Sequence, residues 1–241
     1  MHRLQAMGLQ RILVTTSKGG CGKTTISTNI ASHYAKQGLN VRLFDHDKQG
    51  SSLSWVNRRP EEINLVHGVD ASKNFDHRMT RSWQLRVPPD TDVAVIDTPA
   101  GVDVSELAEL FQYDDSVLIP VLPSPIDIHA TAHFIKELLT VGKARKKMVR
   151  LAVIANRVRK NTVMYHALER FLFSLNIPFI SSLRDTQLYA KAFEMGVGVQ
   201  EINSSRNKID IEQWAPIIRW LETPLIKQTA EIRPLFSQWE S

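Results

Sequence analysis

Residues that could bind a phosphate are concentrated in one short segment. Lys18–Thr25, KGGCGKTT, holds two lysines, three glycines and two threonines. An apolar run, Ile12–Val14, precedes it, and residues 26–35 carry apolar side chains at helical spacing. In a strand, glycine-rich turn and helix arranged in this order, backbone N–H groups converge on a phosphate at the helix N-terminus. Lys23 would then reach the β- and γ-phosphates, and the Thr24 hydroxyl would bind Mg²⁺.

The segment departs from the strict G-x-x-x-x-G-K-[ST] pattern at its first position. Ser17 stands where that glycine belongs, and a second lysine, Lys18, follows it. A flexible glycine turn with unrelated lysines is the alternative interpretation. The composition and the flanking strand and helix favour a phosphate loop over that alternative.

KGGCGKTT resembles the deviant Walker A motif of the ParA/MinD family of ATPases, which position DNA and other cellular cargo. The resemblance implies ATP and Mg²⁺ as cofactors. It also implies that Lys18 reaches across a homodimer to the partner's nucleotide, where a cation would stabilise the charge of phosphoryl transfer. The nucleotide-binding residues that it implies in this loop are Gly19, Gly20, Cys21, Gly22, Lys23, Thr24 and Thr25.

Two carboxylates follow the next buried strand, Val41–Phe44. Asp45 and Asp47 stand at alternate positions, so both could face one Mg·phosphate centre. The segment resembles the family's D-x-D-P-Q, which implies that Asp45 supports the water shell of Mg²⁺ and that Asp47 orients the attacking water. The alternative is a charged turn that caps the next helix. Lys48 replaces the family's proline, which leaves open an altered hydrolysis rate.

Asp97 ends a continuous apolar run, Val93–Asp97, of the kind expected for a central parallel strand. It resembles the Walker B aspartate, which holds Mg²⁺ through water. The following TPAG resembles the family's second switch loop.

Asn156 follows another apolar run, Leu151–Ala155. The Asn156–Arg157 pair resembles the family's adenine-reading position; the alternative is that Asn156 caps the next helix. The later stretch SSLRDTQLYAKAFEMGVGVQE is similar to the family's last strand and following helix, and Asp185 in it is the further nucleotide-binding residue that the resemblance implies.

The remaining elements are predicted from apolar spacing and from glycine and proline positions. Pro123 and Pro125 delay a helix until about Asp127, which would cap it. The other predicted helices cover 51–62, with Trp55 inward, 74–85, 161–173 and 206–221, and the other strands cover 63–66, 117–121 and 177–181. Together they predict one doubly wound α/β domain, mostly parallel, with helices on both faces of the sheet; the resemblance spans residues 10–222.

Composition excludes several classes of protein. The chain has 241 residues and a formal charge of +5, and its single cysteine, Cys21, excludes a disulfide framework and a cysteine-cluster metal site. No apolar run is long enough for a transmembrane helix, and residues 1–10 lack a signal peptide's apolar core. We expect residues 1–8 to form a short disordered leader. His67 and His77 are interpreted as solvated. We therefore expect a cytoplasmic protein, and the family resemblance implies that it associates with the nucleoid.

Basic residues in the C-terminal part predict a surface for non-specific DNA. The family holds DNA through such residues, and the corresponding ones here are Arg184, Arg206, Lys208 and Arg219. The run Lys143–Arg150 is a competing patch, and ordinary surface charge is the alternative interpretation. The C-terminal tail lacks the basic amphipathic membrane helix of MinD-like proteins.

These observations predict a weak ATPase whose ATP state is a dimer, and which positions cargo together with non-specific DNA and a small ParB-like or adaptor protein. In this interpretation Lys18, Lys23 and Asp47 are catalytic, Thr24, Asp45 and Asp97 hold the metal, and no membrane is involved. The alternatives are a MinD-like membrane positioning factor, a metabolic enzyme on the same scaffold, and a binding module without turnover.

Overall fold

The structure is a computed structural model that describes residues 8–72, 87–112, 115–140, 148–159, 162–174, 177–203 and 207–223. Its sheet is formed by β1 (Gln10–Val14), β2 (Val41–Asp45), β3 (His67–Asp70), β4 (Val93–Asp97), β5 (Ser116–Val121), β6 (Arg150–Val158) and β7 (Phe179–Arg184). The strand order is β3-β2-β4-β1-β5-β6-β7, and each neighbouring pair is parallel. This confirms the predicted doubly wound fold.

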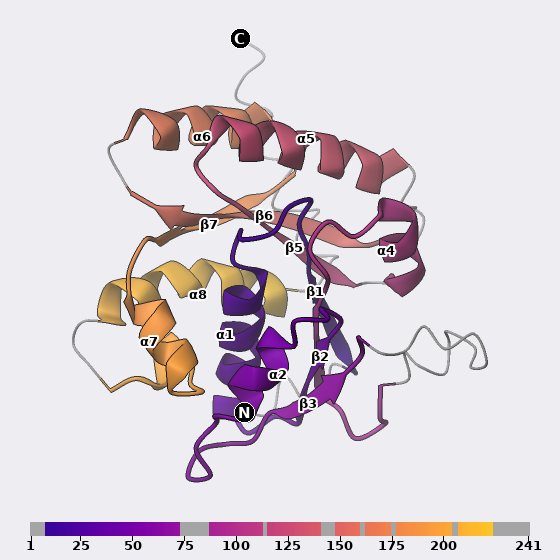
Figure 1. The fold of residues 1–241 in the computed structure, drawn as a ribbon, viewed down its shortest axis with the longest axis vertical. Helices are drawn as coiled ribbons and strands as arrows, with labels where there is room; N and C mark the ends of the chain where they lie inside the picture. Colours follow the sequence, from indigo (N-terminus) through magenta and orange to yellow (C-terminus); the bar gives the residue numbers. More distant parts are fainter. Residues whose placement is uncertain are drawn as a thin grey trace.

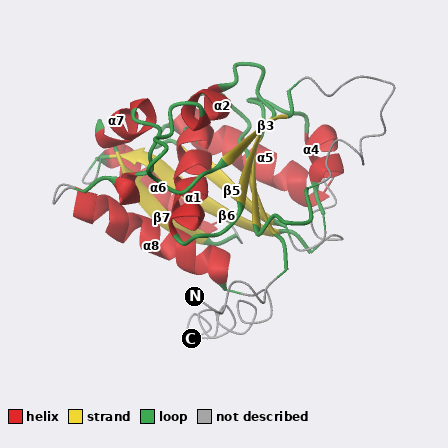
Figure 2. Cartoon of the chain, turned by 90° about the horizontal axis from the view of Figure 1, so that it is seen from below, coloured by secondary structure: helices red, strands yellow, loops and turns green. Residues whose placement is uncertain are grey.

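Helices cover both faces of the sheet (Figures 1 and 2). They are α1 (Lys23–Lys36), α2 (Ser51–Val56), α4 (Val104–Leu110), α5 (Pro125–Thr140), α6 (Val163–Ser174), α7 (Leu188–Glu194), the short 3-10 helix η1 (Val199–Glu201) and α8 (Lys208–Glu222). One core joins the sheet to α1, α2, α7 and α8 and contains Tyr34, Trp55 and Trp214. The other core lies under α4, α5 and α6 and contains Leu107 and Phe134.

Strand residues alternate between these two cores. Ile12 and Val14 belong to the α1 side, and Leu13 between them belongs to the α5 side. Because both faces are covered, central strands such as Val93–Asp97 are buried along their whole length. Burial on both faces explains why these strands could be predicted from continuous apolar runs. Trp55 of α2 is fully buried, as predicted.

The region after β2 differs from the prediction. α2 ends at Val56 because Pro60 lacks the N–H that would bond to the Val56 carbonyl. The predicted strand at 63–66 is wrong; β3 begins at His67, which pairs with Arg42 of β2. The helix predicted at 74–85 lies outside the described residues, as does His77, whereas His67 is exposed.

The start of α5 also differs. The helix begins at Pro125 rather than at Asp127, because proline fits the first helical position, where no N–H is needed. The Ser124 hydroxyl accepts a hydrogen bond from the Asp127 N–H at 3.3 Å, so serine rather than aspartate caps this helix.

The last strand and the last helix are shifted relative to the prediction. β7 starts at Phe179 and extends to Arg184, and α8 starts at Lys208. Two isoleucines near the start of α8 are exposed, Ile209 by 50% and Ile211 by 43%. The leader, the residues 143–147 of the basic run, Arg206 and the C-terminal tail lie outside the described residues.

Candidate functional site: a phosphate loop, a carboxylate cluster and a cavity

The loop between β1 and α1 presents the N-terminus of α1. Gly22 precedes the helix with φ 94°, in the left-handed region that glycine tolerates, and no side chain caps it. The first-turn N–H groups are therefore left to bind an anion, which the helix dipole favours. Lys23, the first helical residue, is only 7% exposed. This geometry is that of a phosphate-binding loop.

Asn156 fixes the loop from the side. Its amide Nδ2 donates to the Cys21 carbonyl at 2.8 Å, which leaves the amide oxygen to accept a hydrogen bond. A Cβ at Gly22 would lie 2.1 Å from the same Nδ2, so residue 22 must be glycine for the contact to form. Asn156 lies inside β6, so the alternative prediction that it caps a helix is wrong. Cys21 is buried, and burial raises the pKa of its thiol.

The carboxylate cluster consists of Thr24, Asp45, Ser52 and Asp97. Asp97 Oδ2 accepts a hydrogen bond from the Thr24 hydroxyl at 2.8 Å and another from the Ser52 hydroxyl. Burial raises the pKa of Asp97 to about 6, although both hydroxyls lower it. Thus the loop, the end of β4 and the start of α2 already meet at one carboxylate.

Asp45 lies beside Asp97, because β2 and β4 pair in register at these two residues. Its Oδ1 accepts from the Asp47 N–H at 3.0 Å, and its Oδ2 accepts from the Leu53 N–H at 3.1 Å. Burial raises the pKa of Asp45. Because Leu53 is in the first turn of α2, Asp45 also caps that helix, as the alternative interpretation of this segment expected.

The cluster fits Mg²⁺ when phosphate is present. Asp97 Oδ1 is buried without a hydrogen-bond partner, and hydroxyl and carboxylate oxygens are the ligands that Mg²⁺ prefers. Within the described residues no group of three or more His, Cys, Asp or Glu side chains could hold a metal by itself. Mg²⁺ commonly binds one or two carboxylates and completes its shell with phosphate and water. Thr24 and Asp97 would therefore hold the ion and position it against a phosphate.

Lys18 differs from Lys23 in its surroundings. Its side chain is 38% exposed, and Nζ lies 3.9 Å from Asp127 Oδ1 on α5. Asp47 is half-buried, and its carboxylate accepts from the Gln49 N–H at 3.0 Å, while Lys48 is exposed. Lys18 is therefore partly exposed and held only by a long ion pair, whereas Lys23 is buried.

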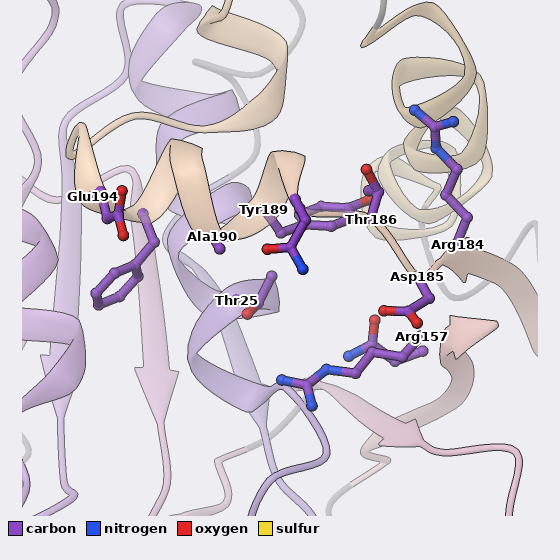
Figure 3. A pocket seen from close by; sticks show the side chains of 11 residues that line it. Thr25, Arg157, Arg184, Asp185, Thr186, Tyr189, Ala190 and Glu194 are labelled. Carbon is purple, nitrogen blue, oxygen red and sulfur yellow. The ribbon is translucent and has the colours of Figure 1, made fainter. Parts of the chain in front are cut away.

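A cavity of about 460 Å³ opens beside the phosphate loop (Figure 3). It lies at the carboxyl ends of β6 and β7 and is called the β6–β7 cavity. Its lining includes Thr25 from α1, Asn156 and Arg157 from β6, and Asp185 and Tyr189 from the segment after β7. Because Thr25 follows Thr24, the cavity continues directly from the phosphate loop, at the sheet edge where open α/β folds bind ligands.

The family model for the CobQ/CobB/MinD/ParA nucleotide binding domain matches residues 12–199. This range contains the loop, the carboxylate cluster and the cavity. The chain belongs to the ParA/MinD family. Members of this family are P-loop ATPases.

Three similar proteins illustrate the relationship. The carboxysome distribution protein A of Halothiobacillus neapolitanus is 32% identical over 194 residues, which cover 80% of this chain and 88% of that protein. A candidate plasmid partition protein of Borrelia burgdorferi B31, solved with AMPPNP, has a TM-score of 0.65 at 17% identity and covers 87% of this chain and 98% of its own. A variant of Cyanothece McdA in complex with ATP has a TM-score of 0.61 at 15% identity, over 86% and 93% of the two chains.

The four residues predicted to bind DNA differ in whether their charge is available at the surface. Arg184 donates to both carboxylate oxygens of buried Asp210, at 2.9 and 2.6 Å, so its charge is paired with that carboxylate although its side chain is 33% exposed. Lys208 and Arg219 are exposed on α8, and Arg206 lies outside the described residues. Lys208 and Arg219 therefore remain candidate DNA-binding residues, and Arg184 does not.

Three site residues were not predicted from the sequence. Ser52 contacts Asp97, while Arg157 and Tyr189 line the cavity. Ser52 lies just after the Asp45–Gly50 segment, so its position in the sequence could have indicated that it belongs to the same site. Arg157 was visible only as part of the Asn–Arg pair, and nothing in the spacing marked Tyr189. No helix among the described residues has the length and apolar character needed to cross a membrane.

Proposed function

We propose that this chain is a ParA-type ATPase that binds Mg·ATP, dimerises around it and positions a cargo through slow, partner-stimulated hydrolysis. The observation that carries the proposal is the division between the two lysines. Lys23 is 7% exposed at the start of α1, whereas the Lys18 side chain is 38% exposed at the rim of the loop. A buried lysine serves the chain's own phosphates, and an exposed one can serve a partner's.

The proposed chemistry assigns one role to each residue. Lys23 and the N-terminus of α1 bind the phosphates, Thr24 and Asp97 hold Mg²⁺, and Asp45 supports its water shell. Asp47 orients the attacking water, and Lys18 of the partner copy stabilises the charge on the phosphates. When bound, Mg²⁺ neutralises charge that develops on the phosphate oxygens. Hydrolysis then depends on dimerisation.

The base of the nucleotide would occupy the β6–β7 cavity. One N–H of Asn156 Nδ2 donates to the Cys21 carbonyl, and the amide oxygen remains as an acceptor for the base. Adenine presents an N6 amino donor, whereas guanine presents an acceptor at the corresponding position. Asn156 therefore favours ATP over GTP in this proposal, and Asp185 lies at the same cavity, paired with Arg159 at 2.7 Å.

The cargo is proposed from the comparison. Of the three similar proteins described, the one with the highest identity, 32%, is a carboxysome distribution protein, which favours a protein assembly as the cargo over a plasmid. Non-specific DNA would serve as the matrix, held by Lys208, Arg219 and Arg206. A dimer presents each cation twice, and contacts made by counterion release are cumulative, so DNA affinity should rise steeply with ATP.

Fluorescence anisotropy on random-sequence duplex DNA tests the proposal. With ATP the protein should bind, ignore sequence and weaken sharply between two salt concentrations; with ADP it should not bind. Lys208→Glu and Arg219→Glu should remove DNA binding and leave ATP-dependent dimerisation intact. Lys136→Glu, which changes an exposed lysine of α5, is the matched control. An ATP-bound dimer without DNA affinity at low salt would contradict the DNA-matrix part of the proposal.

A further inference from the structure

Ser52 belongs to the carboxylate cluster, but the proposed chemistry gives it no role. Its side chain is fully buried in the first turn of α2, a helix that lies beside α1 (Figure 1). The Ser52 hydroxyl donates to Asp97 Oδ2, at the end of β4. The start of α2 is therefore joined to a carboxylate that the proposed function assigns to Mg²⁺.

The two carboxylate oxygens of Asp97 have different surroundings. Oδ2 accepts hydrogen bonds from Thr24, at 2.8 Å, and from Ser52. Oδ1 is buried and has no hydrogen-bond partner among the described residues. Because the two donors come from different helices, α1 and α2, they restrict rotation of the carboxylate more than either would alone. Oδ1 is thereby held in one direction and left open for a ligand.

The two donors also differ in what the metal requires of them. In the proposed function Thr24 is itself a ligand of Mg²⁺, so its hydroxyl must serve the ion and Asp97 at the same time. Ser52 lies outside the phosphate loop and is not one of the proposed ligands. Among the described residues, its hydroxyl is the only side-chain donor to Asp97 that the ion does not also need.

The helix that carries Ser52 is anchored on both sides of it. The Leu53 N–H donates to Asp45 Oδ2 at 3.1 Å, so the first turn of α2 contacts both carboxylates. Trp55 is fully buried, and its Nε1 donates to the Val197 carbonyl at 3.2 Å. Any residue can supply the N–H to Asp45, whereas the contact with Asp97 requires a hydroxyl at position 52. A donor on a well-anchored element can hold a metal ligand accurately.

We propose that Ser52 is a positioning residue that orients Asp97 for Mg²⁺ and thereby raises the affinity of the site for the ion. The inference rests on the proposed function, because it takes Thr24 and Asp97 as the residues that hold the metal. Hydrogen bonds to metal ligands fix their orientation, and loss of one such bond typically costs about 10–100-fold in metal affinity or activity. Ser52 acts through Asp97 and does not itself bind the ion.

Calorimetry with AMPPNP, an ATP analogue that resists hydrolysis, tests this inference. Affinity is measured with Mg²⁺ and with EDTA, and the ratio of the two affinities gives the contribution of the metal. The variants are Ser52→Ala, which removes the donor, and Ser52→Thr, which keeps it. Ser54→Ala, at a half-buried position of the same helix, is the matched control. Thermal unfolding of each variant checks that it is folded.

Ser52→Ala should lower the contribution of Mg²⁺ by about tenfold and change the affinity in EDTA by less than about twofold. Ser52→Thr and Ser54→Ala should keep the wild-type ratio. An unchanged ratio in Ser52→Ala would overturn the inference. So would equal losses with Mg²⁺ and with EDTA, because the substitution would then weaken the phosphate loop and not the metal site.

A folded Ser52→Thr variant that loses as much as Ser52→Ala would also overturn the inference, because the hydroxyl would then not be the group that matters. A wild-type protein that binds AMPPNP no better with Mg²⁺ than with EDTA would overturn the proposed metal site itself. The failure of the inference and the failure of the proposed function are therefore distinguishable.

Discussion

The carboxylate cluster and the β6–β7 cavity meet at the same helix, α1, but they are assembled to different degrees. In the cluster, Asp97 already accepts from Thr24 and Ser52, and Asp45 accepts from two backbone N–H groups. In the cavity, Arg157 has no partner among the described residues and a strained backbone. The cluster is mostly paired within the chain, with Asp97 Oδ1 as its one open atom named above, whereas the cavity has a whole unpaired cation.

This difference indicates how binding energy would be distributed between the two regions. A preassembled cluster needs little rearrangement, so it can supply most of the phosphate and metal affinity. An unpaired side chain contributes binding energy only when the ligand supplies its partner, so such a side chain can discriminate between nucleobases. The predictions below test this division, beginning with the largest expected effect.

Lys23→Ala should weaken Mg·ATP binding by at least about 100-fold, because the phosphates lose a buried, charge-assisted contact. Calorimetry measures the loss, with Arg170→Ala, at an exposed position of α6, as the control. A smaller loss for Lys23→Ala than for Arg157→Asn would reverse the comparison between the two regions. Unchanged ATP affinity in Lys23→Ala would show that the loop does not bind phosphate.

Asp97→Asn should stabilise the nucleotide-free protein at pH 7.5 by roughly 3 kcal/mol. The pKa of Asp97 is raised from 3.8 to about 6, so the folded state binds more protons than the unfolded state between these pH values. The stabilising effect of the protonated carboxyl is complete below pH 3.8 and is lost as pH rises through about 6.

Urea unfolding of wild type and Asp97→Asn from pH 4 to pH 7.5 measures this effect. The difference in unfolding free energy between the two proteins should grow up to about pH 6 and then stay constant. A difference that does not change with pH would contradict the burial of an unpaired carboxylate oxygen at this position.

Asn156→Asp tests the connection between the two regions. The substitution keeps the shape of the side chain but turns a carboxylate oxygen toward the Cys21 carbonyl, in place of the 2.8 Å hydrogen bond. We expect a cost of about 1–3 kcal/mol in stability and about tenfold weaker ATP binding. Asn156→Ala, which removes the contact without adding a charge, should cost less. Equal effects of the two variants would argue against the fixed amide orientation.

Asp127→Asn should have the smallest effect. It removes the charge 3.9 Å from Lys18 Nζ, and pairs this exposed contribute roughly 0–1 kcal/mol. The released lysine should lower the protein concentration needed for the ATP dimer by about twofold. Light scattering across a dilution series measures the midpoint; a higher midpoint would mean that Asp127 supports the dimer instead of holding Lys18 back.

The carboxylate cluster could be predicted from the sequence because local geometry determines it. Asp45 and Asp97 each end a buried parallel strand, and parallel strands end at the same edge, so spacing alone brings the two carboxylates together. The right-handed crossover rule limits the possible strand orders but does not determine which one forms. The resemblance supplied the roles that geometry alone could not.

The cavity could not be predicted in the same way. The bulge at Arg157 depends on how β6 pairs with β7, and these strands have no alternating pattern that fixes their register. For the same reason β3 was placed too early: His67–Asp70 has little apolar character, and its strand conformation comes from pairing with β2. Arg184 looked like a surface cation because its partner, Asp210, lies on a distant helix.

Light scattering of wild type, Lys18→Ala and Asp47→Ala with ATP and with ADP tests the central claim most directly. Wild type should dimerise with ATP only. Lys18→Ala should bind ATP and stay monomeric, because the cation for the partner's phosphates is missing. Asp47→Ala should accumulate as a dimer, because the attacking water is no longer oriented. One oligomeric state in all three proteins, independent of ATP, would contradict the proposed division between Lys18 and Lys23.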